Sequence, residues 1–181
     1  MRRRTLWLMA LVLVGCGIPV DNGPEVVDLE VAAPPDDEQP TLGELAAVSM
    51  YLVRNDALVH VTRDLPSPPS PHVIFESLLE GVTEPEERAN LRSSVPPGTR
   101  IIEVRENGST LHVDLSREFA GVGGEEEILA VAQIVLTAAS IEGVDLVAFE
   151  LEGVPTDVPV AGGALSVDPV SADDYASLVA P

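Results

Sequence analysis

The sequence predicts an α+β fold in which a small, mainly antiparallel sheet has helices packed on one face. Residues 100–106 and 109–115 flank Asn107-Gly108. This pair is typical of a tight β-hairpin turn, because both central residues of a type I′ turn need positive φ. Residues 125–140 are apolar over a wide arc at helical spacing, which indicates a central packed helix. Along the chain, the predicted elements are a hairpin followed by a helix, two strands, a second helix and a final strand.

The region before this core is predicted to form a hairpin and a helix. Residues 48–53 and 57–62 are rich in β-prone side chains and are separated by three polar residues, so we expect two short strands joined by a tight turn. Ser70-Pro71 is typical of a helix start, and apolar side chains four residues apart predict a helix over 72–79. Gly81 is expected to end this helix.

The predicted strand over 109–115 separates a buried face from an exposed one. Leucine and valine alternate in it with polar residues, so one side faces the core and the other faces water. On the exposed side of this hairpin we expect Arg105, His112 and Glu103. Such a polar row could select a partner without joining the core.

A second helix, a last strand and a tail are predicted from residue composition and from the alternation of apolar and polar residues. A short helical stretch is expected over 85–91 and a strand over 145–151. Beyond Gly153 prolines, glycines and acids return, so we expect a loosely attached C-terminal tail, residues 161–181, with a short helix near 173–179.

The N-terminus has the pattern of a secretion signal. Three arginines precede an apolar run from Thr5 to Val14, which at about ten residues is well short of the roughly 20 that span a bilayer. Leu13, Val14 and Gly15 then lead into Cys16 and resemble the lipobox of bacterial lipoproteins. We therefore expect removal of residues 1–15 and acylation of Cys16, which would hold the protein on the extracytoplasmic face of the cell membrane.

Residues 16–46 are predicted to be an acidic, proline-rich tether between this anchor and a domain over 47–160. Cys16 is the only cysteine, so an intramolecular disulfide is excluded. Loss of the signal would leave seven basic residues against thirty acidic ones. This charge argues against nucleic acid and against direct attraction to anionic lipid head groups, because both need basic patches.

Six short segments stand in an order typical of one family: Leu78-Leu79-Glu80-Gly81-Val82-Thr83, Val95-Pro96-Pro97-Gly98-Thr99-Arg100, Leu111-His112-Val113-Asp114-Leu115-Ser116, Gln133-Ile134-Val135-Leu136-Thr137, Gly143-Val144-Asp145 and Glu152-Gly153. They resemble the landmarks of the GerMN domain, the sporulation and spore germination module, over about residues 47–160. Two positions depart from the family pattern, which often has Gly-Pro-Thr at 81–83 and an aromatic residue at 136.

The resemblance implies a non-enzymatic module of the cell envelope. It also implies the helix-strand-strand-helix-strand order of the ring-building modules of export complexes, and it carries no catalytic motif. Similar lipoproteins occur in actinomycetes, and a chain with ten arginines and no lysine is typical of such a GC-rich genome. Envelope proteins are the expected partners.

Residue patterns for catalysis or metal binding are missing from the sequence. It contains no Gly-x-Ser-x-Gly, no His-Glu-x-x-His and no phosphate loop. His60, His72 and His112 show no ligand spacing, so we expect no metal and no cofactor. A membrane-tethered interaction module is therefore the favoured function. The alternatives are a carrier or sensor of a small ligand or glycan, which would need an enclosed pocket, and a cell-wall hydrolase, which would need a catalytic cleft.

Overall fold

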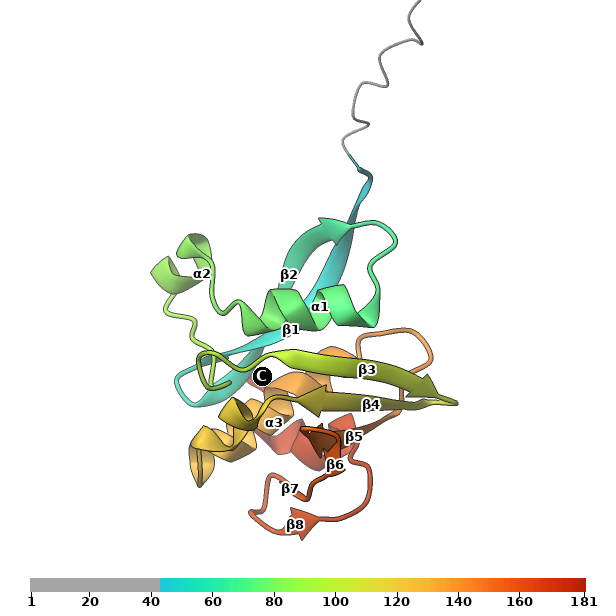
Figure 1. Cartoon of the computed structure of the whole chain (residues 1–181). Helices are drawn as coiled ribbons and strands as arrows, with labels where there is room; N and C mark the ends of the chain where they lie inside the picture. The colour runs from blue at the N-terminus through green and yellow to red at the C-terminus, as the bar shows by residue number, and fades with distance from the viewer. Residues whose placement is uncertain (1–42) are drawn as a thin grey trace, which may run out of the picture. The chain divides into compact units, whose positions relative to one another are not determined.

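The structure of the chain is a computed structural model that describes residues 43–181 (Figure 1). The predicted signal segment, the lipobox with Cys16 and the predicted tether as far as residue 42 lie outside the described residues. In the part of the chain that the structure describes, no helix is long and apolar enough to cross a membrane.

The described region begins with the predicted hairpin. Strands β1 (Leu45–Arg54) and β2 (Ala57–Pro66) pair antiparallel along their whole length. Asn55 and Asp56 form the turn with φ of 52° and 58°. Positive φ at both central residues is the pattern of a type I′ turn, which matches the right-handed twist of the strands. The hairpin is confirmed, and its strands are longer than predicted.

Helix α1 (Pro71–Leu79) begins and ends as the sequence predicts. The Ser70 side chain accepts a hydrogen bond from the Val73 amide at 3.4 Å, and Pro71 occupies the first turn. Gly81 follows the end of the helix with φ of 91°, a conformation that costs glycine little. Helix α2 (Glu84–Arg88) is shorter than the predicted stretch over 85–91.

A largely buried ion pair links the connection between α1 and α2 to the hairpin. Arg63 of β2 donates to both carboxylate oxygens of Glu86, at 2.9 and 2.7 Å, and also to the carbonyl oxygens of Ser77 and Gly81. Burial raises the pKa of the Glu86 carboxyl, but hydrogen bonds from Arg63 and Thr83 outweigh burial and lower it. The carboxylate therefore stays ionised against its partner.

The main sheet has the strand order β3-β4-β5-β6. Strands β3 (Ile101–Asn107) and β4 (Thr110–Leu115) are antiparallel, β4 and β5 (Leu146–Leu151) are parallel, and β5 and β6 (Val154–Pro155) are antiparallel. The parallel pair arises because helix α3 crosses over between β4 and β5. The mixed α+β class is thus confirmed.

The β3–β4 turn lies one residue later than predicted. Asn107 pairs with Thr110, so Gly108 and Ser109 are the central residues, and Gly108 has φ of 62°. The assignment of Asn107-Gly108 to the central positions was wrong. A turn with glycine at its first central position, as in type II′, needs only one residue of positive φ. This register places Arg105 directly opposite His112, where the predicted turn would have placed Glu103.

Helices α1 and α3 (Glu125–Ala138) lie between the hairpin and the main sheet (Figure 1). Every residue from 129 to 138 is buried, as expected for a helix that is packed on both sides. The Tyr51 amide on the outer edge of β1 donates to the Thr137 hydroxyl of α3 at 3.1 Å. The predicted central helix is confirmed, and it contributes to one core shared by hairpin and sheet.

The C-terminal segment is part of this core, so the expected loosely attached tail is wrong. It contains β7 (Val158–Pro159), β8 (Leu165–Ser166) and the 3-10 helix η2 (Ala172–Leu178), which overlaps the short helix predicted near 173–179. Tyr175 is fully buried and donates to the Pro159 carbonyl at 2.9 Å. Near the chain end, the Ala180 amide donates to the Leu58 carbonyl of β2 at 2.8 Å.

Candidate functional site

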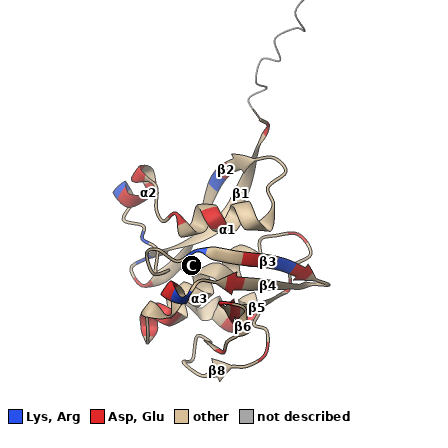
Figure 2. Cartoon of the chain, in the orientation of Figure 1, with Lys and Arg blue, Asp and Glu red and all other residues tan. Residues whose placement is uncertain are grey.

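The outward face of the main sheet carries a polar cluster, which we call the sheet-face cluster: Glu103, Arg105, His112 and Glu150. These residues come from three neighbouring strands, β3, β4 and β5, and alternate with residues that point into the core. Helices α1 and α3 pack on the opposite face of the sheet. Figure 2 shows acidic and basic residues side by side along β3.

Arg105 is the centre of this cluster. Its Nη2 atom donates to both carboxylate oxygens of Glu150 at 2.8 and 2.7 Å, and its Nε atom donates to Glu103 at 2.9 Å. The hydrogen bonds that Arg105 donates to the Glu150 carboxylate are the main reason that the pKa of the Arg105 guanidinium is raised. The side chain is therefore held across three strands while it stays partly exposed.

His112 joins the cluster through the carboxylate of Glu150. Its Nδ1 atom lies 3.5 Å from Glu150 Oε1, and the side chains of His112 and Glu150 are 26% and 13% exposed. The structure thus brings together Arg105 and His112, as the sequence predicts, but through an acid that was missed. Alternation in residues 145–151 places Glu150 outward, yet only the parallel β4–β5 pairing brings it beside His112.

The other two histidines lie elsewhere. His60 packs edge-on against Tyr51 on the hairpin, with ring centroids 5.7 Å apart, and His72 lies 3.2 Å from Glu76 on α1. Within residues 43–181, no group of three or more histidine, cysteine, aspartate or glutamate side chains is placed to hold a metal ion.

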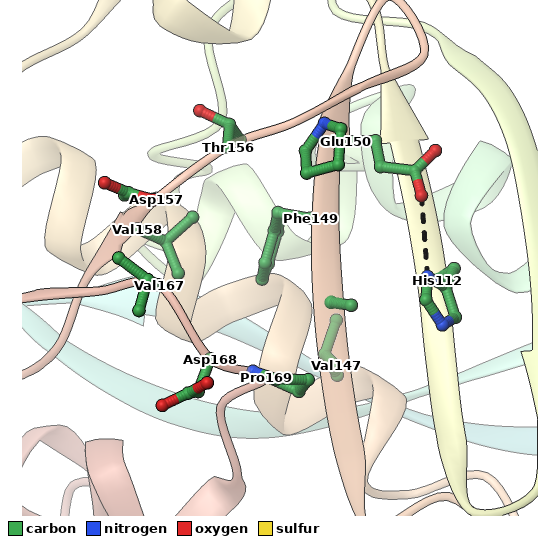
Figure 3. A pocket seen from close by; sticks show the side chains of 12 residues that line it. His112, Val147, Phe149, Glu150, Thr156, Asp157, Val158, Val167, Asp168 and Pro169 are labelled. Carbon is green, nitrogen blue, oxygen red and sulfur yellow. Dashed lines mark ion pairs between the residues drawn. The ribbon is translucent and has the colours of Figure 1, made fainter.

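A small pocket, which we call the β5 pocket, adjoins the cluster (Figure 3). Its volume is about 120 Å³, and Val147, Ala148 and Phe149 of β5 line its base. His112 and Glu150 lie on one side of it. The segments 155–158 and 167–169 form the other side. Pockets for small molecules are usually about 300–1,000 Å³, so this one has room for a single side chain only.

The polar groups of the cluster are linked to one another by hydrogen bonds and ion pairs. Among the side-chain contacts of the described residues, the charged partner of His112 is Glu150. Glu150 accepts two hydrogen bonds from the Arg105 guanidinium, which fix the orientation of its carboxylate. The cluster is thus a linked set of hydrogen-bond donors and acceptors with a pocket beside it.

These features define a class of protein: a small α+β domain with the GerMN fold. The first GerMN domain of the sporulation protein GerM from Bacillus subtilis is similar at 23% identity and a TM-score of 0.55, over 71% of this chain and 98% of that one. The tandem GerMN domains of the same protein are similar at 22% identity and a TM-score of 0.57, over 72% of this chain and 48% of that one. This chain spans about half the length of the tandem structure.

The chain belongs to the Germane family, described as sporulation and spore germination, which matches residues 46–157. The resemblance expected from the sequence over residues 47–160 is therefore confirmed. None of the curated proteins matches the chain.

Proposed function

We propose that this protein is an extracytoplasmic lipoprotein whose GerMN-type domain is a non-catalytic docking module for proteins of the cell envelope. Acylated Cys16 would attach it to the cell membrane, and the acidic, proline-rich segment that follows would connect the anchor to the domain. Its family, described as sporulation and spore germination, and its similarity to a sporulation protein support a role in processes of that kind. The observation that carries the proposal is the outward sheet face, where Arg105, His112 and Glu150 are held in fixed positions.

A sheet face with polar groups in fixed positions is suited to a partner for two reasons. Side chains that are already ordered lose little conformational entropy on binding. Arg105 also keeps free donor capacity, because a guanidinium has five N–H donors and here uses two nitrogens for its acidic neighbours. A partner carboxylate or carbonyl can therefore bind without breaking the cluster.

The docking face is tested by replacing Arg105 and His112 with alanine together. We expect the melting temperature to change little, because exposed ion pairs contribute only about 0–1 kcal/mol each. Recovery of envelope partners by crosslinking and affinity capture from membranes should fall several-fold. His72→Ala with Arg88→Ala is the matched control: it removes the same two residue types from α1 and α2, where each also pairs with a glutamate. Equal recovery from both double variants would place the docking face elsewhere.

The membrane anchor is tested separately with Cys16→Ala. Because Cys16 supplies the only thiol in the chain, the variant should incorporate no palmitate analogue during metabolic labelling and should keep its signal segment. The wild-type chain should be labelled and should partition into the membrane fraction. Label on the variant would contradict the anchoring proposal and leave the docking proposal untouched.

A further inference from the structure

The β5 pocket has two sides of different electrostatic character. On one side, Glu150 is neutralised by Arg105 and approached by His112. On the opposite side, Asp157 and Asp168 are exposed, and neither takes part in an ion pair among the described residues (Figure 3). Among the described residues, the pocket therefore presents two unpaired carboxylates on one side and an ion-paired carboxylate on the other.

Between these carboxylates the lining is apolar. Ala148 lies at the base, and Pro155, Val158, Val167 and Pro169 contribute to the wall opposite His112 and Glu150. A long basic side chain matches this arrangement, because its aliphatic stem packs on apolar surface while its charged end reaches acids. Arginine also fits carboxylates with paired N–H donors.

The surroundings of the pocket favour a protein segment as the occupant. Val154, Leu165 and Val167 are 64%, 67% and 78% exposed and lie in, or within two residues of, the segments that wall the pocket. Such exposed apolar side chains are suited to contact with a partner. A second copy of this chain would bring the same acids to the interface, and like charges facing each other across an interface are costly. An anionic lipid surface is disfavoured as the occupant as well, because its negative charge would face the same acids.

We infer that the outward sheet face docks a basic segment of the partner protein, and that the β5 pocket receives one arginine or lysine side chain from it. The inference rests on the proposed docking function and specifies the chemistry of the partner. It assigns Asp157 and Asp168 to recognition of the charged end, and Val158, Val167 and Pro169 to packing on the stem. The sheet-face cluster then lies beside the bound segment and contacts its polar groups.

The inference is tested by titrating the isotope-labelled whole chain with acetyl-Leu-Arg-Leu-amide and following amide signals by nuclear magnetic resonance. We expect saturable shifts at Ala148, Val158 and Val167. The same peptide with citrulline, which keeps the shape of arginine without its charge, should bind about three- to tenfold more weakly, as expected for the loss of one or two exposed ion pairs.

Variants of the protein complete the test. Asp157→Asn with Asp168→Asn should weaken the arginine peptide to a similar extent. Asp64→Asn with Glu87→Gln removes the same number of charges from exposed positions on β2 and α2, and should change affinity less than twofold. Equal binding of the citrulline peptide, or shifts confined to another surface, would overturn the inference.

Crosslinking separates the inference from the proposed function. The two double variants to compare are Asp157→Asn with Asp168→Asn and Arg105→Ala with His112→Ala. If each of them lowers partner recovery, the docking function and the inference about the pocket are both supported. If only the latter pair lowers recovery, the sheet face docks a partner without a basic side chain in the pocket, and the inference alone fails. If neither pair lowers it, the docking function of this face fails as well.

Discussion

A chain that ends at Ala161 should lose its cooperative thermal transition, or melt more than about 10 °C below the full chain. Truncation removes Tyr175, which is fully buried, and Val170, which bridges β5 at Val147. Loss of one large buried aromatic side chain costs about 3–5 kcal/mol, and whole domains are stable by only about 5–15 kcal/mol. Circular dichroism during heating measures the change.

Tyr175→Phe is the matched control for this truncation. It keeps the buried ring and removes only the hydrogen bond to the Pro159 carbonyl, which should cost about 0.5–1.5 kcal/mol and lower the melting temperature by a few degrees. If the truncated chain melted as high as this single variant, the C-terminal segment would not be part of the core.

Val135→Asp should prevent folding. Val135 is 1% exposed on α3, within a run of buried residues that serves both the hairpin and the sheet. The aspartate carboxylate would be buried without a partner. Burial of such an unpaired charge costs at least about 3–5 kcal/mol if it stays ionised. We expect a collapsed circular dichroism spectrum and rapid digestion by protease.

The control for Val135→Asp is Ala139→Asp, at the exposed end of the same helix. It adds the same charge near the C-terminus of α3, where the helix dipole penalises an acid by about 0.3–1 kcal/mol. This variant should therefore fold. Native-like stability of Val135→Asp would contradict the position of α3 between two β layers.

The elements that the sequence predicts are those with strong local signals. Asn55 and Asp56 follow a β-prone run, Ser70 and Pro71 start α1, and the apolar arc of α3 is long enough to exclude a strand. These signals depend on neighbours within a few residues. They identify the elements and their order, but not which other layer each element packs against.

What the sequence does not predict depends on contacts between distant residues. Asn107-Gly108 and Gly108-Ser109 are two candidate pairs for the centre of the turn between β3 and β4. The pairing of the packed strands selects Gly108-Ser109. Glu150 becomes a partner of Arg105 through the crossover that places β5 beside β4. Tyr175 lies among prolines, glycines and acids with no periodic pattern, so no local signal marks it as a core residue.

The position of α3 also determines how the domain responds to a ligand. Because its buried side chains belong to the same core as those of the hairpin and the sheet, the two β layers are expected to unfold together as a single cooperative unit. A partner that binds only the outward sheet face would then stabilise the distant hairpin to the same extent, since ligand binding shifts the equilibrium of the whole unit. Slower hydrogen exchange in β1 and β2, far from the bound surface, would report the occupancy of that surface.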